Sequence, residues 1–209
     1  GAWRGGDAGG RIGGVLMRVT RRTLMLGSAA SAFGGLPPAE AADPYPPPFS
    51  TPHAQFTVLD PREEAGHISL RDLDGRRRTL ATYRGKAVLL AFWASWCPPC
   101  RRELPILHRL QNQAKSEPFV VVPVSLDRDA GTAAAYIRRL QLDGFSSFID
   151  TGGEVASGPK SKVATPFPLY GMPMSYVIDA RGRSGGYLTG EADWSAPEAL
   201  ALLRFYARS

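Results

Sequence analysis

Two cysteines, Cys97 and Cys100, are the residues in this chain with the clearest chemistry. They are the only cysteines among 209 residues, and Pro98 and Pro99 lie between them. Two cysteines cannot form a disulfide framework, and alone they cannot complete a four-ligand zinc site. Over one helical turn, however, this spacing brings both sulfurs within bonding distance. The pair is therefore either redox-active or incidental.

The position of the pair favours redox chemistry. It comes directly after residues 86–93, a nearly continuous apolar run typical of a strand buried on both faces. A helix is expected over residues 97–115, where Leu104, Leu107 and Leu110 recur at helical spacing. The first cysteine then lies at a helix N-terminus, where free amide groups and the helix dipole favour a thiolate.

The two prolines fit this position because the first N–H groups of a helix have no partner within the helix. Pro98 and Pro99 also lack an N–H, so the amide of Cys100 becomes the nearest donor to the Cys97 sulfur. We therefore expect Cys97 to attack a substrate disulfide and Cys100 to resolve the mixed disulfide that forms.

A metal site built on half a zinc knuckle is the alternative interpretation of the pair. His53, His67 and His108 are the only histidines, and none lies at ligand spacing in a matching knuckle. We expect no metal and no other cofactor.

Strands and helices alternate through the rest of the chain. Asp74-Gly75, between expected strands at 67–73 and 76–80, is a two-residue hairpin signal. The remaining expected elements are a strand at Phe119–Ser125, a helix at 130–141, strands at 175–179 and 186–189, and a helix at Pro197–Tyr206 capped by Ser195. This order predicts an α/β sandwich around a mixed sheet, with an N-terminal β-hairpin extension.

Residues 91–105 read Ala-Phe-Trp-Ala-Ser-Trp-Cys-Pro-Pro-Cys-Arg-Arg-Glu-Leu-Pro. This segment resembles the active-site segment of the thioredoxin-like TlpA/ResA reductases, which are exported thiol–disulfide oxidoreductases. Gly171-Met172-Pro173 is similar to the Gly-X-Pro segment of that family, and it follows in the right order. The resemblance extends from the hairpin to the last helix and implies a thioredoxin-like fold.

The resemblance also implies a substrate-binding surface. Pro173 matches the family's cis-proline, which abuts the cysteine pair and whose flanking backbone pairs with an extended substrate. The other expected substrate-binding residues are Trp96, Pro98, Pro99 and Met172.

Glu103 matches an acidic residue that ResA-like members hold near their cysteines. It lies three residues after Cys100, on the same helix face, where a buried carboxylate could take the thiol proton. The alternative is an exposed acid in the first helical turn. Thioredoxin carries a buried Asp in the preceding strand where this chain has Ala91, which leaves Glu103 as the nearby candidate for proton transfer. Pro105 matches a proline that kinks the helix.

Residues 157–170, with Lys160 and Lys162, have no clear counterpart in the family. The segment runs directly into Pro173 and should border the active site. It is either a partner-recognition loop or a tolerated insertion.

The first 41 residues have the layout of an export signal. Residues 1–16 precede the first methionine and are interpreted as upstream sequence. Residues 17–41 form the expected signal peptide, with Arg21-Arg22 before a mildly apolar stretch and Ala39-Glu40-Ala41 as the cleavage site. The paired arginines resemble a twin-arginine signal, although a general secretory signal has nearly the same layout.

The proline-rich segment 42–54 is expected to be an extended linker, or a membrane tether if the signal is uncleaved. The thioredoxin-like domain is then expected over residues 55–209.

The charge pattern does not indicate nucleic-acid binding. The net charge is +6, but five of the 25 basic residues lie in residues 1–42, and the others are mixed with acidic residues. No apolar run reaches the roughly 18 residues of an unbroken membrane span, which excludes a multi-span protein.

We therefore expect a monomeric periplasmic reductase that receives electrons from a membrane thiol donor. Its expected clients are proteins with disulfides of the CxxC type, such as apocytochrome c or a copper-delivery protein. No histidine lies between the cysteines to favour their reduced form, which argues for a reductant. The alternative is a Cu(I) chaperone that uses both cysteines and a distant histidine.

Overall fold

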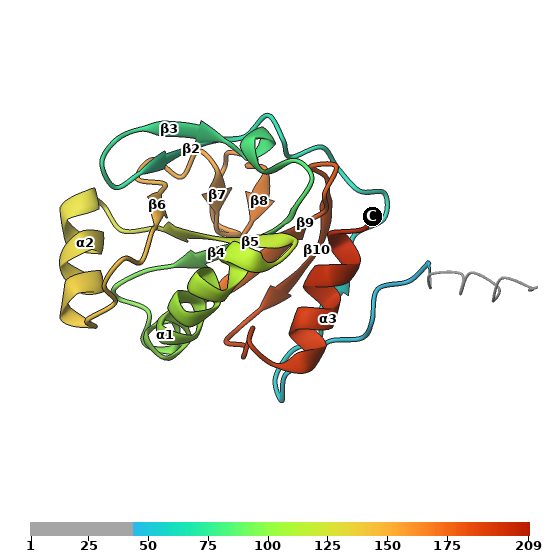
Figure 1. Cartoon of the computed structure of the whole chain (residues 1–209). Coiled ribbons are helices and arrows are strands. Elements are labelled where there is room, and N and C mark those ends of the chain that lie inside the picture. The colour runs from blue at the N-terminus through green and yellow to red at the C-terminus, as the bar shows by residue number, and fades with distance from the viewer. Residues whose placement is uncertain (1–43) are drawn as a thin grey trace, which may run out of the picture. The chain divides into compact units, whose positions relative to one another are not determined.

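The computed structural model describes residues 44–209 (Figure 1). The expected signal peptide, residues 17–41, and the expected upstream sequence, residues 1–16, lie outside the described residues.

A mixed sheet of eight strands carries the fold, in the order β1-β10-β9-β4-β5-β6-β2-β3. The central strand β4 pairs in parallel with β5 and antiparallel with β9. A separate parallel pair consists of β7 and β8. The strands are β1 (Thr57–Val58), β2 (Ser69–Asp72), β3 (Arg77–Thr79), β4 (Ala87–Trp93), β5 (Phe119–Ser125), β6 (Phe148–Ile149), β7 (Ala156–Ser157), β8 (Phe167–Pro168), β9 (Met174–Ile178) and β10 (Ser184–Thr189).

The central strand divides the interior into two cores. All seven residues of β4 are buried, as its apolar run predicts. Because successive side chains of a strand point to opposite faces, Leu89 and Ala91 enter one core while Leu90 and Phe92 enter the other.

Three helices contribute to the first core: α1 (Pro98–Gln113), α2 (Ala130–Arg139) and α3 (Pro197–Tyr206). Figure 1 shows α1 and α3 in front of the sheet. The apolar side chains that these helices bury all belong to the core that contains Leu89. The face that carries Leu89 and Ala91 is thus the helical face of the sheet.

The opposite face is covered by segments without α-helix. They are the 3₁₀ turn Leu80–Tyr83 and the chain around β7 and β8. Phe167 is 0% exposed, and its ring centroid lies 5.8 Å from that of Phe92 and 4.9 Å from that of Tyr176. Segment 157–170, whose role the sequence leaves open, therefore contributes side chains to the second core.

The expected α/β sandwich around a mixed sheet is confirmed, together with its hairpin extension. Strands β2 and β3 pair antiparallel around Asp74-Gly75 and add to the sheet beyond β6. The expected cap of the last helix is wrong. Helix α3 begins after Ala196 with no side-chain cap, because Ser195 donates its hydroxyl to Asp193 in the preceding turn.

The packed part of the chain begins before residue 55. The proline-rich sequence favours an extended linker, but Phe49 within it is buried against Trp194, with ring centroids 5.2 Å apart. The Phe56 N–H donates to the Phe49 carbonyl at 2.8 Å and closes a short loop between them. A proline-rich composition does not show that one aromatic residue has a partner far along the chain.

Candidate active site

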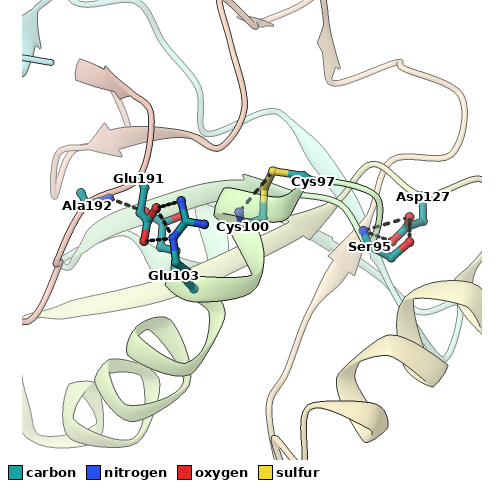
Figure 2. The surroundings of a disulfide bond; sticks show 8 residues. Ser95, Cys97, Cys100, Glu103, Asp127, Glu191 and Ala192 are labelled. Atoms are coloured by element: carbon teal, nitrogen blue, oxygen red, sulfur yellow. Dashed lines mark hydrogen bonds and ion pairs between the residues drawn. A yellow bond between two sulfur atoms is a disulfide. The ribbon is translucent and has the colours of Figure 1, made fainter. Parts of the chain in front are cut away.

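Cys97 and Cys100 form a disulfide where β4 is followed by α1 (Figure 2). The two sulfur atoms are 2.07 Å apart, and both residues are buried. Cys97 has extended backbone angles and is the N-cap of α1, with Pro98 and Pro99 in the first turn. Pro98 is exposed and Pro99 is half-buried. The predicted position of the pair at a helix N-terminus is confirmed.

A backbone hydrogen bond distinguishes the two sulfurs. The N–H of Cys100 donates to the Sγ of Cys97 at 3.2 Å, as expected from the two intervening prolines. This amide and the positive end of the α1 dipole favour negative charge on the Cys97 sulfur once the disulfide is reduced. Cys100 lies in the first turn of α1 and is buried like Cys97, so the backbone amide, and not burial, distinguishes the two sulfurs.

A buried carboxylate that the sequence analysis missed lies beside the loop before the cysteines. Asp127 accepts the Ser95 hydroxyl at 2.7 Å and the Ser125 hydroxyl at 2.8 Å. The Ser95 backbone N–H lies 3.2 Å from both carboxylate oxygens (Figure 2). Asp127 thus fixes the turn two residues before Cys97. A polar residue just beyond the end of β5, the parallel neighbour of β4, was the available signal.

The Met172–Pro173 peptide bond is cis, as the resemblance implies. Met172 and Trp96 line one groove of about 540 Å³, together with Tyr170. Trp96 is 64% exposed and Tyr170 is 59% exposed, which is unusual for large apolar side chains. Small residues make up much of the rest of the lining: Gly152, Gly153, Ala156, Ser157, Gly158 and Gly171.

Glu103 is buried, which rejects the alternative of an exposed acid in the first turn. It is 1% exposed, and its Oε1 accepts the N–H of Ala192 at 3.2 Å and the indole N–H of Trp194 at 3.1 Å. Burial raises the pKa of Glu103 to about 8, even though the two hydrogen bonds lower it; nearby Glu191 raises it further. The Glu103 carboxyl is therefore mostly protonated at neutral pH. Because Oε1 accepts both N–H groups, Oε2 is the oxygen left to carry the proton.

Glu103 and Cys100 lie three residues apart on α1 and are both buried. Within residues 44–209 the hydrogen bonds of Glu103 go to Ala192 and Trp194, and none joins it to a sulfur. The neighbouring Arg102 forms an ion pair with Glu191 and none with Glu103 among the described residues. Helix α1 also continues through Pro105.

No group of three or more His, Cys, Asp or Glu side chains in the described part of the chain could hold a metal ion. Of the three histidines, His108 lies with its Nε2 2.9 Å from the Asp143 carbonyl oxygen. Among the helices of residues 44–209, none is long and apolar enough to cross a membrane.

The model of the AhpC/TSA family matches residues 61–183, a range that includes both cysteines, Glu103 and Pro173. The chain belongs to the AhpC/TSA family. This family member is 29% identical over 146 residues to the thiol-disulfide oxidoreductase ResA of Bacillus thuringiensis subsp. konkukian, covering 68% of this chain and 79% of the relative. It is 30% identical over 129 residues to the ResA of Bacillus cereus, covering 62% of this chain and 69% of the relative.

A solved structure agrees with these relatives. The crystal structure of a thiol:disulfide interchange protein of the DsbE type from Chlorobium tepidum matches this AhpC/TSA family member with a TM-score of 0.55 at 29% identity. The match covers 69% of this chain and 99% of that one. The resemblance to TlpA/ResA proteins and the thioredoxin-like fold are thus confirmed. With its cysteine pair joined in a disulfide, the chain is a thiol–disulfide oxidoreductase of the ResA type.

Proposed function

We propose that this oxidoreductase is an exported reductase of client protein disulfides, with Cys97 as nucleophile and Cys100 as resolving thiol. The observation that carries the assignment is the hydrogen bond from the Cys100 N–H to the Cys97 Sγ at the start of α1. That amide and the helix dipole stabilise a thiolate at Cys97 and leave Cys100 as the neutral partner.

The reaction begins when the Cys97 thiolate attacks one sulfur of a client disulfide. The client's other sulfur leaves as a thiolate and takes up a proton. Cys100 then loses its proton and attacks the Cys97 sulfur, which forms the Cys97–Cys100 disulfide and releases the second client sulfur. The client gains two electrons and the pair loses two. A membrane dithiol donor returns two electrons to the pair for the next cycle.

Glu103 is proposed to exchange a proton with Cys100 during the second step. Burial raises the pKa of Glu103 to about 8, close to the working pH of a neutral compartment, where a general acid or base is most effective. This exchange would couple the two groups, which are both buried on α1, and the apparent pKa values would then belong to the group.

The groove between Trp96 and Tyr170 is proposed to receive the client. It runs along Met172, which precedes the cis-proline Pro173, and its many glycines let an extended chain approach closely. Exposed Pro98 and half-buried Pro99 border the disulfide itself. An extended client segment with a large apolar side chain beside its cysteine would fit this surface.

The proposed clients are proteins with CxxC-type disulfides, such as apocytochrome c or a copper-delivery protein, in an oxidising compartment outside the cytoplasm. The ResA name of the relatives and the export-signal layout of residues 17–41 support this placement. The absence of a histidine between the cysteines supports the reducing direction.

Two single substitutions test the assignment of the cysteines. A Cys100→Ser variant should accumulate mixed disulfides with clients, because nothing resolves the bond at Cys97. A Cys97→Ser variant should trap almost none. The measurement is the recovery of disulfide-linked complexes from exported material on non-reducing gels. Equal trapping by both variants would refute the assignment.

A further inference from the structure

The cover over the Glu103 carboxyl includes residues that no family match or sequence motif assigns to the site. Trp194, which donates its indole N–H to this carboxyl, has no exposed surface. The Trp194 ring lies against the ring of Phe49, with centroids 5.2 Å apart, although the two residues are far apart in the sequence. The family match begins only at residue 61, so Phe49 lies outside it.

Phe49 belongs to a short loop that is closed on itself, residues 49–56, which we call the strap. The Phe56 N–H donates to the Phe49 carbonyl at 2.8 Å, and the Thr51 N–H donates to the Ala54 carbonyl at 2.7 Å. The strap therefore has its own backbone structure, and both of its end residues are buried aromatics.

A groove of about 610 Å³ runs beside this cover. The strap lines one side, and Ile106 of α1 with Glu191, Ala192 and Asp193 line the other. Ala192 is the second hydrogen-bond donor to Glu103, so the groove reaches the backbone that contacts the buried carboxyl. Phe49 lines this groove and packs on Trp194, the indole that donates to the Glu103 carboxyl.

We propose that Phe49 is a positioning residue for Glu103: by holding Trp194 in place, the strap keeps the carboxyl dry and hydrogen-bonded. The carboxyl depends on that burial for its high proton affinity, because desolvation is the largest cause of its raised pKa. The charged and titratable groups around it are Glu191 with its partner Arg102, the cysteine pair on α1, and His53, Asp193 and Glu198 at the groove. None of them is changed when Phe49 is truncated.

The test uses the oxidised protein, in which the cysteines have no proton to lose. The ¹³C NMR signal of the Glu103 carboxyl, assigned by its loss in Glu103→Gln, should titrate with a midpoint near the raised pKa of about 8. In Phe49→Ala, water reaches the carboxyl, and the midpoint should fall by at least ~1 pH unit.

The strap provides its own matched control. Phe56 is also a buried aromatic at the end of this loop, but it packs on Tyr206, with ring centroids 6.0 Å apart, instead of on Trp194. Phe56→Ala retains the backbone hydrogen bond of the strap and the contact between Phe49 and Trp194, so it should leave the Glu103 midpoint in place. Phe49→Leu retains a large apolar side chain, so its Glu103 midpoint should stay close to that of the parent protein. That result would show that the effect of Phe49→Ala comes from the entry of water. Equal movement in Phe49→Ala and Phe56→Ala, or movement in neither, overturns the proposal.

The effect on catalysis rests on the proposed proton exchange between Glu103 and Cys100. If the midpoint falls in Phe49→Ala and the rate of client reduction changes with it, both ideas are supported. If the midpoint falls and the rate at every pH stays that of the unmodified protein, the strap has the proposed role and the proton exchange is refuted. The NMR midpoint therefore tests the role of the strap, and the reduction rate separately tests the proton exchange.

Discussion

At the scale of single residues, the buried Glu103 lowers the free energy of unfolding by an amount that depends on pH. Its pKa is about 8 in the folded protein, against 4.5 for an ordinary Glu side chain, so between these two pH values the folded protein binds more protons than the unfolded chain, by up to one. The free energy of unfolding therefore falls as the pH rises through this window. This loss of stability is absent below the pKa of the unfolded chain and complete above the pKa of the folded protein.

Replacing Glu103 by Gln removes this dependence, because Gln resembles the protonated carboxyl in shape and never ionises. Near pH 5 the variant and the parent should unfold at similar urea concentrations. Near pH 9 the variant should be the more stable protein by roughly 5 kcal/mol, the value of a shift of this size. The measurement is urea unfolding of both oxidised proteins at several pH values. Parallel stability curves for the two proteins would contradict the burial of the Glu103 charge.

Residue types and spacing were sufficient to predict much of this site. The order of Pro98, Pro99 and Cys100 after a buried strand predicted the amide contact to Cys97, and the structure confirms it. The partners of Glu103 could not be predicted, because Ala192 and Trp194 lie 89 and 91 residues away along the chain. A helical position three residues after a cysteine does not reveal whether a distant segment covers it.

At the scale of elements, segment 157–170 combines two separable functions. Phe167 fills the second core between Phe92 and Tyr176, whereas Tyr170 stands at the rim of the groove beside Trp96. Sequence reasoning placed this segment next to Pro173 correctly but could not assign Phe167 to the core. The reason is that β8 has only two residues, too few for an alternating pattern to show which side faces inward.

This division predicts opposite outcomes for two aromatic truncations. Phe167→Ala should lower the free energy of unfolding by about 3–5 kcal/mol, as for other buried Phe residues. Tyr170→Ala should lower it by about 1 kcal/mol or less, since the ring is 59% exposed, yet it should slow the reduction of a client protein. Urea unfolding and client-reduction rates, with a small soluble disulfide as control substrate, separate the two. Unchanged client reduction in Tyr170→Ala would remove the groove from the proposed function.

At the scale of the whole molecule, long-range pairing dominates the fold. Strand β4 pairs with β9, more than 80 residues later, and Asp179 just after β9 is held by Arg62 and Arg183. The sequence patterns predicted the longer strands and the fold class, but not the two-residue strands β1, β6, β7 and β8 or the start of the packed chain at Phe49. A fold assembled from such distant segments is complete only when the last helix, α3, has joined the sheet.

The pair Arg21-Arg22 predicts export by the twin-arginine route, which carries proteins that are already folded. A fold of this kind is compatible with that route. Changing both arginines to lysine should leave the precursor in the cytoplasm, because the twin-arginine route recognises the pair itself. Cell fractionation and N-terminal sequencing of the mature protein are the measurements, with cleavage expected after Ala41. Normal export of the double-lysine variant would instead indicate the general secretory route.

The two edges of the sheet have a consequence for the proposed reduction of client proteins. Strand β1 has only two residues, and β3 at the other edge is short and fully exposed, with Arg77 and Arg78 adjacent. Short, charged edges resist the addition of a further strand and so protect against aggregation. On the proposed function, these edges would keep a client chain from adding to the sheet as a ninth strand and would leave the surface around the cysteine pair as its binding site.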